Sequence, residues 1–458
     1  MFTSTLKTLR RRLHSYISYR VRRAAPYVLT LAGAGLLGSC ASVNEPFIDS
    51  QGERLPAEVS REVTSTAAMS AAAQIVKQSV AEGMAAGAVL VISRRGQIVE
   101  RSAFGYAQLF DAEGMKLENP VVMTPGHVFD LASLTKVFAT TFAIMMLVDA
   151  GVLALDVPVK MYLPKFSSPE KDNISIRHLL THTAGLAPWK PTYFHARDRR
   201  EAFTYITSLP LDYPVGEERH YSDLGFMLLG YIVEKVSGKS LDSYLSRNLY
   251  EPLGLRHTGF RPLESAIGPL VATSQGNPFE RKMVEDPDFG YLIHEDPSRF
   301  DAWREYTLLG EVNDGNSWYA HAGVAGHAGL FSTADGLTRL ITLLMDDGLY
   351  KGLLNNGSLS TKTRLIGAET ISEFLTPDQS GNGLGWAMSS DVLPVTDMPA
   401  GAFGHTGFTG TYVFANPAQS LIIVLLTNRQ NAGVDENGQY PSLSPLRRAV
   451  VDAAMSTN

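Results

Sequence analysis

A serine and a lysine three residues apart stand at the start of a long apolar segment. Ser133 and Lys136 are followed by twelve uncharged residues, 137–148. On a helix this spacing places both side chains on one face, about one turn apart. A serine hydroxyl becomes a strong nucleophile when a neighbour accepts its proton, and a buried lysine with a lowered pKa can do so. The pair therefore predicts a nucleophile, Ser133, and its base, Lys136.

The predicted place of Ser133 in the first turn of a helix adds a second reason. Backbone N–H groups there are free of partners and lie at the positive end of the helix dipole, where they stabilise a developing oxyanion. The pair also has an ordinary structural explanation, a helix-capping serine followed by a lysine whose stem packs on apolar surface. A membrane span over 137–148 is excluded by length, because about 20 residues are needed.

A second candidate group is Tyr221, which precedes Ser222, Asp223 and an apolar segment expected to be helical over 223–236. A tyrosine just before a helix can place its phenol over a neighbouring site and relay protons there. A core tyrosine that closes a loop is the structural alternative.

A third group lies in a late segment, 402–414, that is expected to form a strand. It contains His405, whose ring nitrogens can form hydrogen bonds, followed by the small residues Thr406 and Gly407 and then Phe408. Small residues let a substrate backbone lie against a strand edge, and the Phe408 N–H could serve as a second oxyanion donor. A tight bend in a strand would use the same residues.

In this order, the three groups resemble the motifs of the serine β-lactamase and penicillin-binding superfamily, in its class C-like branch of D,D-peptidases and esterases. The resemblance implies that Ser133 is acylated, that Lys136 and Tyr221 share proton transfer, and that the N–H groups of Ser133 and Phe408 form the oxyanion hole. The segments that carry the resemblance are 129–133 (FDLAS), 221–223 (YSD), 323–332 (GVAGHAGLFS), 383–386 (GLGW) and 404–407 (GHTG).

Two residues depart from the pattern of that superfamily. His405 stands where a lysine is usual, and a neutral imidazole offers a substrate carboxylate only a hydrogen bond near pH 7. Asp223 stands where asparagine is usual, and its charge beside Lys136 favours a protonated lysine.

Two functions from different classes follow. The first is a serine hydrolase with an acyl-enzyme on Ser133, of the D,D-carboxypeptidase, penicillin-binding or esterase type, acting at the cell envelope on a small peptide, β-lactam or ester. The alternative is a catalytically weak lipoprotein that keeps the fold and binds peptidoglycan. His405 and Asp223 are the features that leave this alternative open.

The N-terminal segment predicts export and lipidation. Residues 1–39 carry seven Lys or Arg and no acid, with an almost wholly apolar run over 24–39, followed by Cys40, the single cysteine of the chain. A basic start, an apolar stretch and small residues before a cut are typical of a secretory signal. The ending Leu-Gly-Ser-Cys resembles a bacterial lipobox, with Cys40 as the lipidated residue. With Ala41 next, this implies a periplasm-facing lipoprotein of the outer membrane in a Gram-negative host.

The elements expected to position these groups predict an α+β fold. Strands at both ends of the chain surround a mostly helical middle, so one antiparallel sheet is expected to form from both ends. The predicted organisation is a signal peptide over 1–39, a tether over 40–65 and a hydrolase domain over 66–458, with 66–127 and 379–458 as the α/β part and 128–378 as the helical part. Within the middle, the polar segment 275–316 is expected to form a lid or wall of the site.

Charge and composition exclude other classes of function. Outside 1–39 the chain has 33 basic and 46 acidic residues, a net charge of −13, which disfavours nucleic acid as a partner. We expect no cofactor, because the glycine-rich 323–329 lacks the Lys-Ser/Thr of a phosphate loop. We also expect no metal site, since the spacing of Asp314, His321 and His327 matches no common template.

Overall fold

The computed structural model describes residues 47–48, 54–55, 69–291, 293–351 and 362–456. The predicted signal peptide, Cys40 and most of the tether lie outside the described residues. Among the described residues, no helix is both long and apolar enough to cross a membrane.

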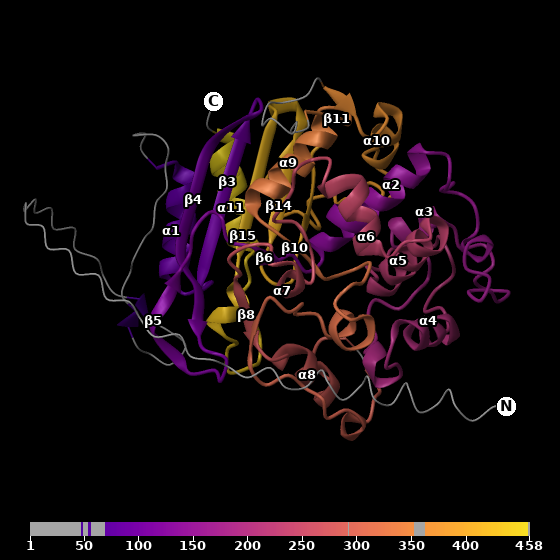
Figure 1. Cartoon of the computed structure of the whole chain (residues 1–458), viewed down its shortest axis with the longest axis horizontal. Coiled ribbons are helices and arrows are strands. Elements are labelled where there is room, and N and C mark those ends of the chain that lie inside the picture. The colour runs from indigo at the N-terminus through magenta and orange to yellow at the C-terminus, as the bar shows by residue number, and fades with distance from the viewer. Residues whose placement is uncertain (1–46, 49–53, 56–68, 292, 352–361, 457–458) are drawn as a thin grey trace, which may run out of the picture. The chain divides into compact units, whose positions relative to one another are not determined.

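The centre of the fold is a six-stranded antiparallel sheet in the order β13-β14-β15-β3-β4-β5 (Figure 1). Three strands come from the beginning of the described chain and three from its end, which confirms the predicted α+β class with a sheet built from both ends. The strands are β3 (Gly87–Arg94), β4 (Gln97–Phe110), β5 (Lys116–Val122), β13 (Phe403–Thr406), β14 (Tyr412–Asn416) and β15 (Leu421–Thr427).

The two central strands are buried on both faces, which explains why their sequences are almost wholly apolar. In β3, Val89 and Val91 face one core, whereas Leu90 and Ile92 face the other. The neighbouring strand β15 alternates in the same way, and its register places Val424 opposite Val91.

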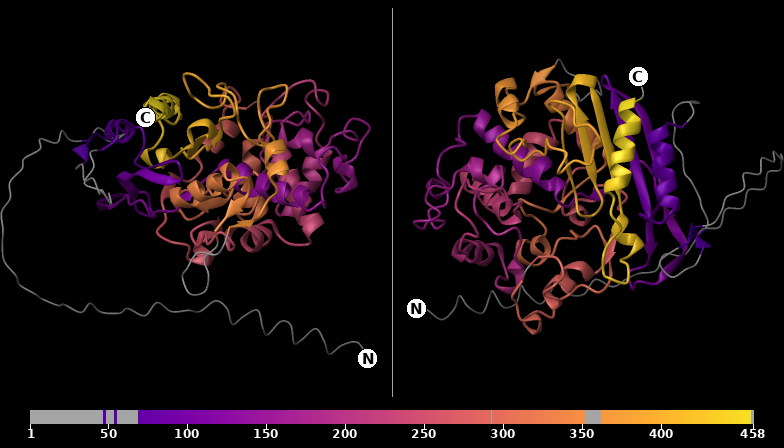
Figure 2. Two further views of the ribbon diagram at one scale, coloured as in Figure 1. Left: turned by 90° about the horizontal axis from the view of Figure 1, so that it is seen from above. Right: turned by 180° about the vertical axis from the view of Figure 1, so that it is seen from behind.

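Helices cover both faces of the sheet (Figure 2). On one face α1 (Ala71–Ala81) and α11 (Ser444–Ser456) pack together and share an apolar core with β3, β14 and β15. On the other face α9 (Ala334–Met345) packs against β15 and β3 and joins the larger core, which continues into the helical part.

The helical part holds most of the remaining elements, and its short strands form small sheets. One of them, β6-β10-β7, matters for the site because β6 leads directly to Ser133. The helices are α2 (Phe142–Asp149), α3 (Ile176–Leu180), α4 (Arg199–Ser208), α5 (Asp223–Ser237), α6 (Leu241–Leu245), α7 (Pro262–Ser265), α8 (Pro278–Glu285) and α10 (Ala368–Phe374). The short strands are β1 (Phe47–Ile48), β2 (Arg54–Leu55), β6 (Phe129–Asp130), β7 (Gly259–Phe260), β8 (Ala272–Gln275), β9 (Thr307–Leu309), β10 (Leu330–Ser332), β11 (Leu349–Tyr350) and β12 (Thr363–Arg364).

Three expectations about these elements need correction. The predicted strand 402–414 is two strands, β13 and β14, because Gly407 and Gly410 sit in a tight turn between them. The predicted helix after Ser133 begins with a π-helical stretch, Lys136–Thr141, before α2. The segment 275–316, described from the sequence only as polar, contains regular elements, α8 and β9, because its few apolar residues are too scattered to indicate them.

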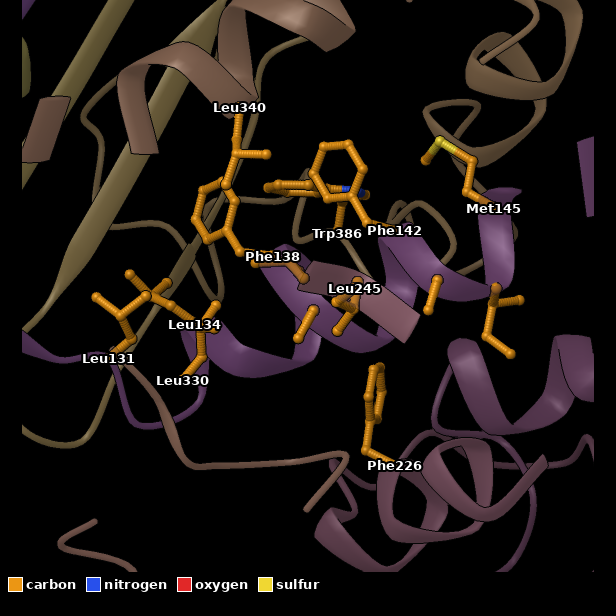
Figure 3. Packing of buried hydrophobic residues seen from close by; sticks show 14 of the residues in the cluster. Leu131, Leu134, Phe138, Phe142, Met145, Phe226, Leu245, Leu330, Leu340 and Trp386 are labelled. Carbon is orange, nitrogen blue, oxygen red and sulfur yellow. The ribbon is translucent and has the colours of Figure 1, made fainter. Parts of the chain in front are cut away.

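An aromatic cluster ties the helix behind Ser133 to the sheet (Figure 3). The Trp386 ring packs edge-on against Phe138 at a centroid distance of 5.6 Å and against Phe403 of β13 at 5.2 Å. All three side chains are buried. The two elements that carry chemistry, the Ser133 helix and β13, therefore share one rigid apolar support.

Candidate active site

A short, strongly held turn presents Ser133. Its predecessor Ala132 has φ of +46°, a left-handed conformation that is unfavourable for a residue with a Cβ. Asp130 stabilises this turn: its Oδ1 accepts a hydrogen bond from Ala132 N at 2.9 Å and its Oδ2 accepts one from Asn313 N at 2.6 Å. Burial raises the pKa of Asp130 to about 6, against the effect of these two N–H donors.

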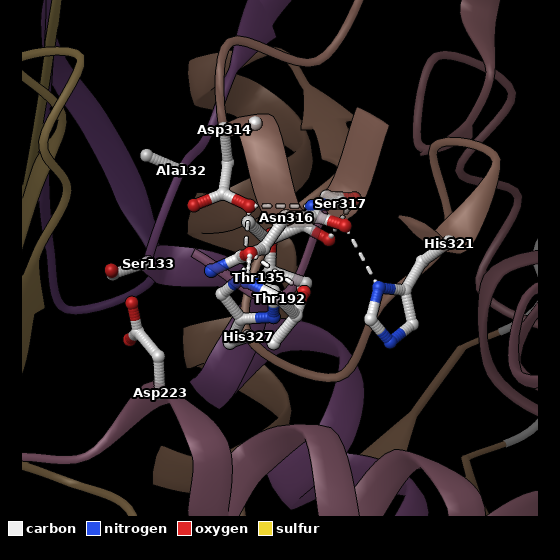
Figure 4. Close-up of polar contacts among 12 residues, drawn as sticks. Ala132, Ser133, Thr135, Thr192, Asp223, Asp314, Asn316, Ser317, His321 and His327 are labelled. Carbon is white, nitrogen blue, oxygen red and sulfur yellow. Dashed lines mark hydrogen bonds and ion pairs between the residues drawn. The ribbon is translucent and has the colours of Figure 1, made fainter. Parts of the chain in front are cut away.

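Ser133, Lys136 and Asp223 form a continuous polar chain. Lys136 Nζ donates to Ser133 Oγ at 2.9 Å and lies 2.7 Å from Asp223 Oδ1. The carbonyl oxygen of His327 accepts a further bond from Nζ at 3.3 Å. Figure 4 shows the Asp223 carboxylate extending toward Ser133 from the start of α5. The Lys136 side chain itself has no exposed surface.

The electrostatics of Lys136 differ from the expectation that burial lowers its pKa. Burial does act in that direction, but the charge and hydrogen bonds of Asp223 and Tyr221 outweigh it, so the pKa of Lys136 is raised. The effect anticipated for Asp223 is therefore the dominant one. Lys136 carries its proton at neutral pH and needs an exit for a proton before it can accept another.

Tyr221 completes this group. Lys136 and Ser133 both lie close enough to its hydroxyl to lower its pKa, and Lys136 Nζ lies 4.8 Å from the centre of its ring. Burial raises the pKa of Tyr221, so the phenol is protonated and can donate. The next residue, Ser222, caps α5: its Oγ accepts from Gly225 N at 3.3 Å. The capped helix start thus fixes both Tyr221 and Asp223.

His182, which carries no motif in the sequence, positions Tyr221. Its Nδ1 accepts the N–H of Ser222 at 3.0 Å, and its ring lies 4.5 Å from the Tyr221 ring, centre to centre. Burial lowers the pKa of His182 well below its usual value, which keeps the ring neutral. No local pattern reveals this role, because the two residues meet across about forty positions of the sequence.

The end of β13 lies directly against the turn that carries Ser133. A Cβ atom on Gly407 would come within 2.6 Å of Leu131 O, so only glycine allows this approach. Thr409 Oγ1 donates to Asp130 O at 2.8 Å and Thr411 Oγ1 donates to Leu131 O at 3.0 Å. These bonds lock the two segments together.

This contact brings the two predicted oxyanion donors to the same site. Across the described residues, the backbone N–H groups of Ser133 and Phe408 bond no acceptor of the chain. Arg429 fixes the Phe408 loop, since its Nη2 donates to Phe408 O at 2.7 Å. Thr406 ends β13 and is paired with Tyr412 of β14.

His405 is a neutral hydrogen-bond acceptor in this structure. Its Nδ1 lies 2.8 Å from the carbonyl oxygen of Thr406, which can only accept, so Nδ1 carries the proton. Burial and, next, the charge of Lys136 lower the pKa of the ring to about 3. Its Nε2 atom is therefore unprotonated, and no bond to it is found among the described residues.

A pocket of about 440 Å³ opens at Ser133. Its aromatic walls include Phe279 and Tyr291 from the segment 275–316, as expected, and Phe408, which is 37% exposed at the rim. Its polar walls are acidic. The complete lining is Ala132, Ser133, Trp189, Tyr221, Asp223, Phe279, Glu280, Met283, Gly290, Tyr291, Asn313, Asp314, Ala328 and Phe408.

Two acidic side chains of the pocket, Glu280 and Asp314, have pKa values that are shifted in opposite directions. Burial and the nearby Asp314 raise the pKa of Glu280 to about 8, so this group is mostly protonated at neutral pH. Asp314 bonds His327 Nε2 at 2.9 Å, and despite burial this partner keeps the pKa of Asp314 below its usual value. The pocket floor therefore holds a hydrogen-bonded pair, Asp314 and His327, beside Lys136.

The three residues weighed as metal ligands separate in space. Asp314 and His327 lie at the site, whereas His321 points away and bonds Asn316 O and Tyr231 Oη (Figure 4). Ligand atoms of Asp223, Asp314 and His327 come within 4.8 Å of one another. The two carboxylates are already paired, with Lys136 and with His327, and the ammonium of Lys136 would repel a cation there.

Comparison with protein families places this geometry in context. The family model described as "Beta-lactamase" matches residues 72–443, most of the chain. The chain therefore belongs to the beta-lactamase family, and the protein is a serine hydrolase of that family. This match confirms the resemblance on which the site assignment from sequence depends.

Two curated relatives show which activities occur among similar chains. An "N-acetylmuramyl-L-alanine amidase" of Bacillus subtilis is 32% identical over 439 residues, which cover 91% of this chain and 94% of the relative. A "Putative D-alanyl-D-alanine carboxypeptidase" of Escherichia coli is 33% identical over 375 residues, or 77% of this chain and 81% of the relative.

Solved structures agree on the fold. The hydrolase EstCE1, titled as having promiscuous acyltransferase activity, superposes with a TM-score of 0.59 at 22% identity and covers 83% of this chain and 97% of its own. At this identity the likeness concerns the fold alone.

Proposed function

We propose that the protein is an acyl-enzyme amidase that cleaves an internal amide bond of cell-wall peptide, with Ser133 as the nucleophile. The observation that carries the proposal is the chain of contacts from Ser133 Oγ through Lys136 Nζ to Asp223, at 2.9 and 2.7 Å. It joins a nucleophile to a proton acceptor at the mouth of a pocket large enough for a peptide side chain.

In the acylation step, Ser133 Oγ attacks the carbonyl carbon of the amide. Its proton passes to Lys136 as Lys136 passes one of its own protons to Asp223, so the net transfer is from serine to carboxylate. This relay removes the difficulty that a protonated lysine cannot act as a base. The oxyanion is stabilised by the N–H groups of Ser133 and Phe408.

When the tetrahedral intermediate collapses, the C–N bond breaks and the leaving nitrogen takes the proton of the Tyr221 hydroxyl. Tyr221 regains a proton from Lys136, which is reprotonated by Asp223. The acyl group remains on Ser133 as an ester. Water then attacks this ester and gives a proton to Tyr221 as Tyr221 passes its own proton through Lys136 to Asp223. When the ester C–O bond breaks, that proton returns through Lys136 to Ser133 Oγ, which restores the hydroxyl.

His405 favours an internal amide over a terminal one. A D,D-carboxypeptidase substrate places a carboxylate directly beyond the scissile bond, where an unprotonated Nε2 would repel it. An internal amide places the next peptide N–H there, which Nε2 can accept. Of the two activities named for relatives, the muramyl–alanine amide of the Bacillus protein fits this site better.

The test uses the soluble fragment that starts after Cys40. It is offered N-acetylmuramyl-L-alanyl peptide, an acyl-D-alanyl-D-alanine peptide, a nitrophenyl ester and a fluorescent β-lactam, and products are identified by mass spectrometry. We expect release of peptide with a free alanine N-terminus, and an acyl adduct on Ser133. Release of D-alanine alone would refute the amidase proposal. Fragment binding that survives Ser133→Ala, with no turnover of any substrate, would support the binding-lipoprotein alternative instead.

We also propose that the protein is exported and anchored at Cys40, facing the periplasm from the outer membrane, with peptidoglycan as its neighbour. The basic start, the apolar run and the lipobox-like ending support this. We expect Cys40→Ser to move the protein from the membrane to the soluble fraction. Continued membrane partition of the variant would refute the anchor.

A further inference from the structure

Arg219 is a partly buried cation without a partner of its own. It lies two residues before Tyr221, in the loop that leads to α5. Its Nε atom is fully buried and bonds no acceptor. Within the described chain, no carboxylate forms an ion pair with its guanidinium. An arginine held out of water without a counter-charge is unfavourable, and this arrangement is explained if an anion from outside completes it.

The neighbours of Arg219 place it on the strand side of the site. Its charge acts on Tyr221, His182 and His405. Neither Arg219 nor His405 lines the pocket at Ser133. Arg219 and His405 thus lie outside that pocket, within electrostatic range of one another and, for Arg219, of Tyr221.

Among the described residues, the acidic groups that act on the charge of Arg219 form no ion pair with it. Asp378 and Asp391 contribute to the electrostatics of Arg219. However, Asp378 Oδ1 accepts hydrogen bonds from Ser380 and from Asn382 N instead. These acids moderate the charge of Arg219 at a distance and leave its donors available.

We propose that Arg219 binds a carboxylate carried by the leaving part of the substrate, one residue beyond the scissile amide. The inference rests on the proposed function, in which Tyr221 protonates the leaving nitrogen, so that the leaving group extends past Tyr221. His405 accepts the next peptide N–H, which places the carboxylate farther out, at Arg219. The planar guanidinium can bind both carboxylate oxygens at once.

This geometry defines a substrate class: an acyl-alanyl residue followed by a second residue with a free carboxylate. It also distinguishes two positions at which a substrate can carry its carboxylate. A carboxylate on the alanine itself meets the unprotonated His405, whereas a carboxylate on the following residue meets Arg219. The position of the negative charge, one residue along the chain, then decides whether a peptide is a substrate.

The first experiment compares N-acetylmuramyl-L-alanyl-glycine with its C-terminal amide, which differ only in that carboxylate. We expect the acid to be preferred 10- to 100-fold in kcat/KM, mainly through KM. Arg219→Gln should bring the acid-to-amide ratio to about one, and Arg219→Lys should keep part of it. The control is Arg200→Gln, an exposed arginine of α4, which should leave the ratio unchanged. Thermal melting verifies that each variant is folded.

A second experiment does not depend on turnover. Binding of acetyl-alanyl-glycine and of its amide to Ser133→Ala protein is measured by calorimetry, with and without Arg219→Gln. A preference for the acid that disappears with Arg219→Gln supports the carboxylate site even if no amide is cleaved, in which case the proposed function alone fails. Equal binding of acid and amide, or a preference that survives Arg219→Gln, overturns the inference.

Discussion

The two sides of Ser133 are built in opposite ways. On the nucleophile side, Lys136 is fully buried and its ammonium is paired with Asp223 and bonded to Ser133 at short distance. On the strand side, His405 is neutral with a free ring nitrogen, Arg219 has no ion-pair partner among the described residues, and Phe408 is exposed. The groups on the nucleophile side therefore satisfy one another within the chain. The polar groups on the strand side lack partners until a substrate supplies them.

The largest effect is expected on the nucleophile side. Ser133→Ala removes the atom that is acylated, so kcat should fall by on the order of 10⁴ to 10⁶, because members of a catalytic group act as a unit. Product formation and the acyl adduct are both followed by mass spectrometry. Ser208→Ala, at an exposed position of α4, is the matched control. Full turnover by Ser133→Ala would exclude the mechanism.

Asp223→Asn tests whether the carboxylate is the proton acceptor. The amide cannot take a proton, so kcat at pH 7 should fall by roughly 10- to 100-fold. Loss of the Asp223 charge also removes the main influence that raises the pKa of Lys136, while burial continues to lower it. Activity of the variant should therefore rise with pH as Lys136 becomes neutral. The measurement is the pH dependence of kcat, and a profile identical to the wild type would contradict the relay.

Much of the nucleophile side could be predicted from the sequence, because helix spacing already relates Ser133 to Lys136 and a helix start relates Tyr221 to Asp223. On the strand side, the sequence predicted a neutral His405 but neither which of its ring nitrogens carries the proton nor any role for Arg219. The proton on His405 Nδ1 depends on the backbone oxygen of Thr406. Whether Arg219 has an ion-pair partner depends on where acids more than 150 positions away lie in the fold. The role of His182 depends in the same way on contacts across loops, which no local period reveals.

His405→Lys tests the strand side directly. Lysine would present a cation where the wild type has an acceptor, so a carboxylate directly beyond the scissile bond should become favourable. We expect kcat/KM for acyl-D-alanyl-D-alanine to rise about tenfold, with a loss of similar size for the internal amide, as a charge-assisted hydrogen bond replaces a repulsion. His405→Gln, which adds no charge, is the comparison. An unchanged ratio of the two substrates would show that His405 does not face the leaving group.

The smallest effect on the reaction is expected for His321, which lies away from Ser133. We expect this residue to affect the stability of the fold at acidic pH instead. Burial lowers the pKa of His321 to about 3, below the usual 6.5 of an unfolded histidine. The unfolded chain therefore binds the proton more readily between these values, and stability that is present above pH 6.5 is lost as pH falls toward 3. One such group removes up to about 1.4 kcal/mol per pH unit. We expect His321→Gln to reduce the loss of unfolding free energy between pH 7 and pH 5 by about 2 kcal/mol, measured by urea titration at both pH values. The variant's absolute stability does not enter this difference, so a pH dependence equal to that of the wild type would show that folding does not lower the pKa of His321.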